Sequence, residues 1–348
     1  MFFYILLFLI VMLLGLSKLK NKNEFIAITL FVVSAARFDV GFDFLSYYNS
    51  IELFQPHDMT YIRFGLLHGG LIEFSNYIGF TQLYFIVTSA VIYFFIHLSL
   101  NKHSENYLYS ILIFIGVPFF FLMSFNFIKQ FTAMVLVLYS IRYIFERKLL
   151  SFIFVIFIAS LLHYTAIMCV CLYYLYGRKI PSVFLIVFFA SSFFAFPLAQ
   201  NIIDTLLPFY SHYLDVKVEG GKSFQALLIL LFLLFIMFRR LINNKKSDFY
   251  FVTFIIGACI YNTFQPIGFS ATRVSYYFLI FLILLVPSFG SRIRKKQFTL
   301  LLIALTFTLF IISLYSNSKV GTRSPSVPYQ TFFNKTIHDI RPYGWVKK

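Results

Sequence analysis

Ionisable and polar residues that could do chemistry occur at a few places in an otherwise apolar chain. The first is the run Arg37-Phe-Asp39-Val-Gly41-Phe-Asp43, in which these residues alternate with apolar ones. On a helix, Asp39 and Asp43 would lie four residues apart and repel each other. We therefore expect an extended segment that bends at Gly41. An ordinary loop with a surface Arg–Asp pair is the simpler alternative.

Two further places supply cations. Asn126, Lys129 and Gln130 have helical spacing and share one face of a predicted helix. Arg273 lies one helical turn before Tyr277. Each cation could instead be an interfacial anchor, because basic and aromatic side chains are common where helices leave a membrane.

These residue types together suit transfer onto a hydroxyl group. Clustered cations bind phosphate or pyrophosphate, and a carboxylate or imidazole beside them can take the hydroxyl proton. The candidate pyrophosphate-binding cations are Arg37, Lys129 and Arg273. The candidate bases are Asp39, Asp43 and His163. The residues alone leave open which of the three is the base.

The composition predicts that membrane helices position these residues. The chain has 348 residues, of which 60% are hydrophobic and 12% charged, whereas soluble domains are about 25% charged. Disorder and a secreted disulfide scaffold are excluded. Continuous apolar runs such as 2–14 and 226–238 predict helices rather than the alternating strands of a barrel. The net charge of +16 lies in short clusters between these runs, so we expect no nucleic-acid partner.

The positive-inside rule predicts the topology. Six basic clusters hold 17 of the 29 Lys and Arg and are expected in the cytoplasm, whereas the other loops, the tail aside, hold six basic and eight acidic residues and are expected outside. The predicted spans are 1–17, 24–37, 81–100, 107–124, 127–145, 183–198, 224–238, 249–264, 274–289 and 298–315. Residues 1–315 would form one transmembrane domain, with outer loops 38–80 and 198–223 and an interfacial or re-entrant helix near 60–75. The tail is 316–348, and charge and crossing count disagree on its side.

The stretch 149–177 is flanked by basic clusters on both sides, so its number of crossings must be even. Two full crossings need about 40 residues, and this stretch has 29. We therefore predict a re-entrant hairpin with its tip at His163, the midpoint. A single tilted helix is the alternative. With the hairpin counted as two helices, we expect an all-α polytopic membrane protein of about 12 membrane helices.

Metal and disulfide chemistry find no support in the pattern. The three cysteines, Cys169, Cys171 and Cys259, lie in apolar stretches, and an odd count there is not a disulfide framework. The remaining histidines show no ligand spacing. We expect no metal site and no cofactor.

Four ordered motifs resemble those of the bacterial O-antigen and exopolysaccharide polymerases of the Wzy/EpsG-like family. They are Arg37-x-Asp39-x-Gly41-x-Asp43 with Tyr47-Tyr48, Phe127-Ile-Lys129-Gln130-Phe-Thr-Ala133, Ala159-x-x-x-His163-Tyr-Thr-Ala166 and Thr272-Arg273-x-x-x-Tyr277. The resemblance covers essentially the whole chain. It departs at Lys129, where the family usually carries arginine, so the bidentate grip of a guanidinium on phosphate is lost while the charge is kept.

The resemblance implies a GT-C-like helical fold in the bacterial inner (cytoplasmic) membrane, with a metal-independent active site facing the periplasm. Donor and acceptor would both be undecaprenyl-pyrophosphate-linked oligosaccharides. Tyr47, Gln130 and Tyr277 would contact the substrate. A Wzz-type chain-length regulator is the expected partner, and membrane lipid surrounds the protein.

Two other classes of function fit part of the pattern. A lipid-linked oligosaccharide flippase would need a large cationic cavity open to both sides, whereas the charged residues here gather at the outer side. A membrane O-acyltransferase could use His163 as its base, but it would draw its acyl donor from the cytoplasm and need His163 to be reachable from there.

Overall fold

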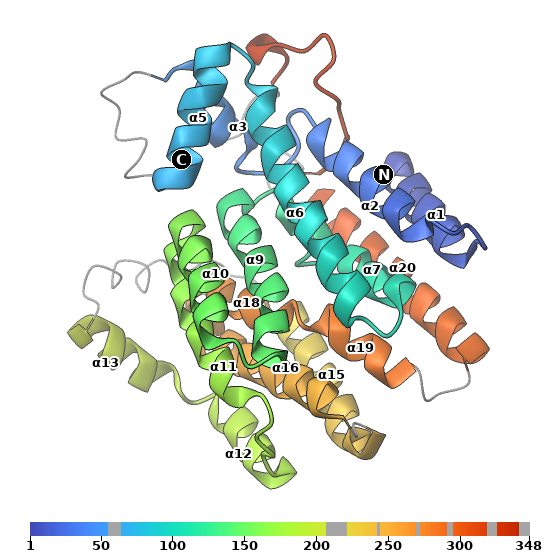
Figure 1. Ribbon diagram of the computed structural model, residues 1–348, viewed down its shortest axis with the longest axis vertical. Helices are drawn as coiled ribbons and strands as arrows, with labels where there is room; N and C mark the ends of the chain where they lie inside the picture. Colours follow the sequence, from blue (N-terminus) through green and yellow to red (C-terminus); the bar gives the residue numbers. More distant parts are fainter. Residues whose placement is uncertain are drawn as a thin grey trace.

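A computed structural model describes residues 1–54, 64–206, 221–241, 244–268, 272–290, 295–318 and 326–340. The regular elements within these ranges are helices (Figure 1). The α-helices are α1 (Phe2–Leu16), α2 (Lys22–Ala35), α3 (Phe44–Glu52), α5 (Leu66–Ile78), α6 (Gln82–His103), α7 (Tyr107–Gly116), α8 (Phe121–Ser124), α9 (Ile128–Phe145), α10 (Leu149–Leu162), α11 (Leu172–Leu175), α12 (Ser182–Ser191), α13 (Phe196–Leu206), α15 (Lys222–Met237), α16 (Lys245–Phe264), α18 (Tyr276–Leu279), α19 (Leu282–Gly290) and α20 (Lys295–Ser318). The 3-10 turns are η1 (Tyr164–Cys171), η3 (Arg239–Leu241), η4 (Gln265–Ile267), η5 (Arg273–Ser275) and η6 (Ile337–Asp339). The predicted loops 38–80 and 198–223 and the tail 316–348 lie partly outside the described residues, as do Arg292 and Arg294 of the last basic cluster.

The outer helices carry large apolar side chains on their outward faces. Phe2 is 79% exposed, Leu150 83% and Leu301 66%. The inner helices α7, α9 and α16 are buried on most sides. A surface this apolar is unfavourable in water but suits lipid. The chain is therefore a multi-pass helical membrane protein.

The predicted number of 12 membrane helices is not confirmed. Within the described residues, five helices are long and apolar enough to cross a membrane, or six if the bent pair α12–α13 is one span. Other apolar helices, such as α1, α7, α10 and α15, have 10–17 residues. At 1.5 Å per residue these reach about 15–25 Å, less than the roughly 30 Å of a bilayer core. The prediction from apolar runs counts α1, α7 and α15 as full crossings.

Two of the predicted spans are broken in the structure. The span 107–124 ends as a helix at Gly116, because Pro118 forces the residue before it, Val117, into an extended conformation. The span 183–198 ends at Ser191, and α13 follows after a bend of 72°. Pro197 is the second residue of α13, a position in the first helical turn where its missing N–H is tolerated.

The chain reverses at His163, as the charge argument required. Helix α10 ends at Leu162, and His163 is extended, with φ −153° and ψ 112°. The rings of Phe152 and Tyr173 lie 5.6 Å apart, and Arg147 donates to the backbone oxygen of Tyr176 at 2.7 Å. Each contact joins one residue before His163 to one at a similar distance after it, as expected when a hairpin turns at His163. The depth of this hairpin in a bilayer stays a prediction.

Most of the described basic loops meet at one end of the helix bundle. Lys102 and Lys148 both pair with Glu146, at N–O distances of 3.1 and 2.9 Å. Lys246, at the start of α16, lies over the ring of Phe145, 5.1 Å from its centroid. We call this the basic end, and its charged residues include Lys102, Glu146, Lys148, Arg239, Lys246 and Asp248. The starts of α6 and α9 and the end of α16 lie at the opposite end.

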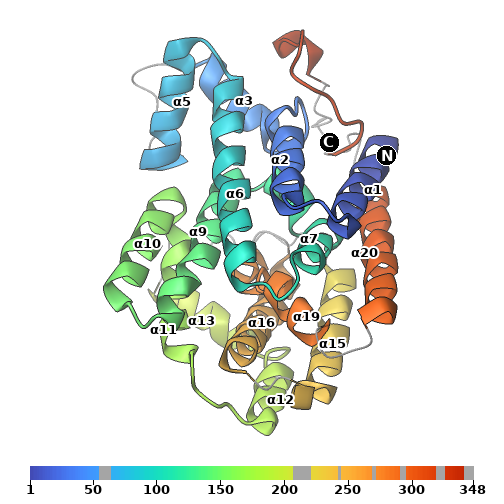
Figure 2. The same ribbon diagram turned by 45° about the vertical axis from the view of Figure 1, so that its right-hand side comes forward.

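The segment 326–340 returns to the N-terminal helices (Figure 2). Tyr329 stacks on Phe3 with ring centroids 3.9 Å apart and donates to the backbone oxygen of Val33 at 2.7 Å. Thr331 forms an isolated antiparallel bridge with Arg37. This part of the tail therefore lies at the end opposite to the basic end, against the side that its own charge favoured.

Candidate active site

The segment between α2 and α3 is not helical, as the spacing of its charges predicted. Gly41 bends the chain with a φ of +108°, and the side-chain oxygen of Asn126 accepts a hydrogen bond from Phe42 N at 2.6 Å. The alternation of polar and apolar residues does not match burial, because Arg37 and Asp39 are buried and Phe42 is exposed. Asp39 has a positive φ of 54°, so the chain turns between Arg37 and Phe42.

Arg37 lies deep in the protein, at the junction of α2, α6 and the turn before α9. Its guanidinium donates to the backbone oxygen and hydroxyl of Ser34 and to the hydroxyl of Ser89, the last at 3.2 Å. The rings of Phe85 and Phe125 lie 5.2 and 5.0 Å away. Arg37 therefore holds three elements together, and its contact with pyrophosphate stays a prediction.

The start of α9 brings together the other two predicted cations. Gln130 Nε2 donates to the backbone oxygen of Arg273 at 2.7 Å. The Arg273 guanidinium stacks on Phe127 at 3.9 Å from the ring centroid, and Lys129 Nζ lies 5.4 Å from the centroid of Phe64. Gln130, which the resemblance implies as a substrate contact, thus positions the turn that carries Arg273; its contact with substrate stays a prediction.

His163 is held at the tip of the hairpin by two hydroxyl groups. Its Nδ1 lies 2.6 Å from Thr165 Oγ1 and 3.2 Å from the hydroxyl of Tyr277. Thr165 in turn donates to Tyr277 at 3.4 Å. In the tautomer with the proton on Nδ1, the ring donates to Thr165 and Thr165 donates to Tyr277. In that tautomer Nε2 is the acceptor nitrogen, which is the one that a base needs. Tyr277 is fully buried and orients the ring, and its predicted substrate contact stays a prediction.

The cations and the histidine converge from three separate parts of the chain. Gln130, next to Lys129 on α9, bonds the backbone of Arg273 at 2.7 Å. Tyr277, four residues after Arg273, bonds His163 at the end of α10 at 3.2 Å. The side chains of Lys129, Arg273 and His163 are half-buried, so each is shielded from bulk water but still accessible. The three predicted residues therefore form one site, at the end of the bundle opposite to the basic end.

The two predicted carboxylates differ in their surroundings. Asp39 is fully buried, whereas Asp43 is half-buried at the start of α3. Tyr47 N bonds the backbone oxygen of Asp43 at 3.2 Å, and the Tyr47 ring stacks on Tyr84 at 5.1 Å between centroids. Asp43 thus lies one helical turn from Tyr47, which is a predicted substrate contact, and both carboxylates stay predictions as bases. Within the described residues, no three His, Cys, Asp or Glu are grouped so as to hold a metal ion.

A buried histidine close to Lys129 was not predicted from the spacing of residues in the sequence. His68 on α5 bonds Tyr84 OH through Nδ1 at 2.8 Å and Thr132 Oγ1 through Nε2 at 3.1 Å. Thr132 donates to the backbone oxygen of Lys129 at 2.8 Å. This chain of bonds ties α5 and α6 to the turn of α9 that carries Lys129. No local signal marks His68, because its partners come from other helices.

Gly41→Ala is expected to destabilise the protein by more than the cost of placing an L-residue at positive φ. At φ +108° an L-residue costs on the order of 1–2 kcal/mol, and a Cβ would lie 2.5 Å from the backbone oxygen of Phe125. Gly79→Ala is the matched control, because Gly79 also has positive φ, +70°, but nothing within 4 Å of the added carbon. Thermal unfolding of the purified protein in detergent measures both, and equal midpoints would show that the close approach at Gly41 is unimportant.

Comparison with known proteins places this arrangement in a family. No curated protein and no solved structure matches the chain. The model of the EpsG family matches residues 23–331, which include the segment after α2, the start of α9, His163 and Arg273. The match also includes both sides of the bridge between Arg37 and Thr331. The chain therefore belongs to the EpsG family of Wzy-like polysaccharide polymerases.

Proposed function

We propose that this protein is an O-antigen polymerase, which transfers a growing glycan from undecaprenyl pyrophosphate to a new lipid-linked repeat unit. The observation that carries the proposal is that hydrogen bonds tie the start of α9, which carries Lys129, to the turn of Arg273, and this turn to His163. Two cations suit the pyrophosphate of the donor, and an imidazole beside them suits the acceptor hydroxyl.

The reaction exchanges one bond for another at the anomeric carbon of the donor glycan. The acceptor hydroxyl oxygen attacks this carbon and forms the new glycosidic bond. The bond from the same carbon to the pyrophosphate oxygen breaks, and undecaprenyl pyrophosphate leaves with the bonding electron pair. The hydroxyl proton passes to Nε2 of His163, with Asp43 as the alternative acceptor. Lys129 and Arg273 neutralise the charge that develops on the leaving pyrophosphate.

Charge neutralisation by two side chains is the role that a divalent cation has in many other phosphate-releasing enzymes. The proposed mechanism therefore assigns no step to a metal ion. Tyr277 and Thr165 keep the imidazole oriented, and Gln130 keeps Arg273 in place.

The side of the membrane that the active site faces is inferred from the basic end of the helix bundle and the opposite end, where the site lies. If the basic end faces the cytoplasm, as the positive-inside rule predicts, the site opens on the periplasmic side of the inner membrane, where we expect flipped repeat units and a Wzz-type chain-length regulator. This position disfavours an O-acyltransferase, because such an enzyme would need His163 at the cytoplasmic end.

A strain in which the gene is deleted tests the proposal. We expect the long polysaccharide ladder to disappear while lipid A–core capped with a single repeat unit remains. Loss of all repeats, the single unit included, would contradict a polymerase and favour a flippase. Complementation with the intact gene must restore the ladder, which excludes effects on neighbouring genes.

A further inference from the structure

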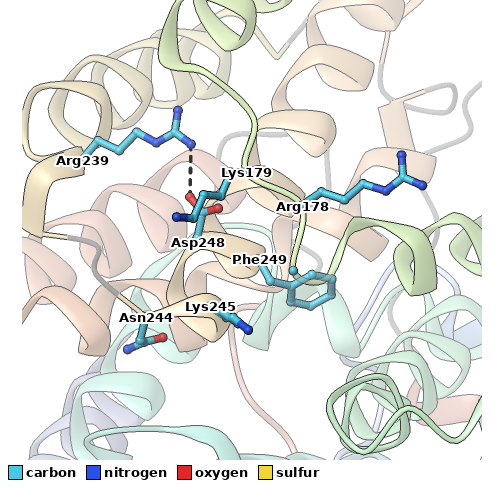
Figure 3. Close-up of a pocket in the computed structure, with 8 residues that line it drawn as sticks. Arg178, Lys179, Arg239, Asn244, Lys245, Asp248 and Phe249 are labelled. Carbon is cyan, nitrogen blue, oxygen red and sulfur yellow. Dashed lines mark hydrogen bonds and ion pairs between the residues drawn. The ribbon is translucent and has the colours of Figure 1, made fainter.

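A cavity of about 350 Å³ lies at the basic end, at the other end of the bundle from the active site. The loop between α11 and α12, the turn η3 after α15 and the first turn of α16 form its walls (Figure 3). Its charged lining residues are Arg178, Lys179, Arg239, Lys245 and Asp248. Four cations and one carboxylate leave three net positive charges around a small space.

The frame of this pocket is held by Arg239. Its guanidinium donates to the backbone oxygen of Ile180 at 2.5 Å and to Ser182 Oγ at 3.0 Å, and it pairs with Asp248 at 3.2 Å. Both members of the ion pair are mostly buried. Asn244 caps α16 by accepting from Ser247 N at 2.7 Å. The pocket is therefore a built feature of the fold, made where three segments are tied together.

Lys179 and Lys245 supply exposed charge at this frame. Figure 3 shows Lys179 beside the Arg239–Asp248 pair and Lys245 near Asn244, whereas the Arg178 side chain extends away from this group. The start of α16 adds the positive end of a helix dipole. An anion with several oxygen atoms can therefore contact lysine and arginine donors together, as phosphate groups do.

The position of the pocket points to the source of that anion. Helix α12 begins at Ser182, which accepts from Arg239 of the pocket, and within its first two turns Val183 is 72% exposed and Phe184 62% exposed. On the other side, α15 ends in the exposed Met237 just before Arg239. Lipid-facing apolar surface thus begins directly beside the cations. This is the depth at which the phosphates of a bilayer lie, and basic pockets between helices at the cytoplasmic surface bind anionic headgroups.

We propose that the pocket binds the phosphate headgroup of an anionic phospholipid. Phosphate is the shared chemistry of such a lipid and of small soluble phosphates. The apolar surface on both sides of the pocket favours the lipid, because its acyl chains would lie along α12 and α15. The proposal is independent of the reaction at the opposite end.

Lipid binding to the purified full-length protein in detergent tests this proposal. Short-chain phosphatidylglycerol is titrated against phosphatidylcholine with the same chains, and native mass spectrometry gives the bound fraction. We expect phosphatidylglycerol to bind more tightly, and Lys179→Gln with Lys245→Gln to weaken it roughly 10- to 30-fold, since each basic residue near an anionic lipid surface contributes a factor of about five. Both lysines are exposed, so the fold should tolerate the change.

Matched variants control for charge. Lys18→Gln with Lys20→Gln removes two exposed charges from the loop between α1 and α2 and should leave binding unchanged. Equal binding of both lipids, or equal loss in both lysine pairs, would overturn the proposal. Inorganic pyrophosphate that binds as tightly as the lipid would assign the pocket to a soluble phosphate compound instead.

Discussion

His163→Asn is expected to abolish long polysaccharide chains while the protein stays in the membrane. The asparagine side chain can keep the hydrogen bonds that Nδ1 makes to Thr165 and Tyr277, so the hairpin tip should remain folded. It has no counterpart of Nε2, the nitrogen that would take the proton. Loss of a general base slows catalysis by about 10²- to 10⁴-fold. The deletion strain that expresses this variant is compared with wild type for ladder length and for membrane-protein level.

Tyr277→Phe separates proton transfer from orientation of the ring. The phenylalanine keeps the buried aromatic packing but removes one of the two hydroxyls that hold His163. We expect a shortened ladder, intermediate between wild type and His163→Asn. If His163→Asn gives a full-length ladder at normal protein level, His163 has no part in the chemistry, and Asp43 becomes the leading candidate for the base.

Arg273→Ala and Lys129→Ala are each expected to remove long chains without loss of protein. Both cations are half-buried beside His163 and are the proposed contacts of the pyrophosphate. Gln130 bonds the backbone of Arg273, so truncation of the side chain leaves that link in place. Lys129→Arg should be tolerated, because positive charge is what the two residues share. Ladder length, normalised to the protein level, measures all three variants.

Arg37→Ala provides a contrast with these variants. Because the Arg37 guanidinium bonds Ser34 and Ser89 in the interior, its removal leaves buried hydroxyls and a cavity, and we expect less protein in the membrane. A normal amount of inactive protein would instead support the predicted contact with pyrophosphate.

A normal ladder from Arg273→Ala and Lys129→Ala would reduce both residues to interfacial anchors and remove the basis of the proposed mechanism.

Local features of the chain were enough to predict much of the architecture. Apolar runs without alternation predicted helices, because only a helix satisfies its own backbone in lipid. Charge on both sides of 149–177 predicted the reversal at His163, and two like charges four residues apart predicted the non-helical segment after α2. The four motifs, in their order, also led to the EpsG family. Each of these inferences depends on residues close together in the sequence.

Contacts between distant segments could not be predicted in this way. The neighbours of Arg37 in the sequence do not show that packing of α2 against α6 buries it between Phe85 and Phe125. His68 became visible only when α5 placed it against Tyr84 and Thr132. The number of full crossings was overestimated because hydropathy does not show where prolines and bends divide a span.

The division between the two kinds of information has a physical cause. Hydropathy, charge and helix-breaking residues act over one or two helical turns, so the chain itself determines where helices begin, where they end and which loops avoid lipid. Which faces of those helices meet depends on the packing of side chains from the whole bundle. Only that packing could bring Lys129, His163 and Arg273, which are up to 144 residues apart, to one site, and place the basic pocket at the other end.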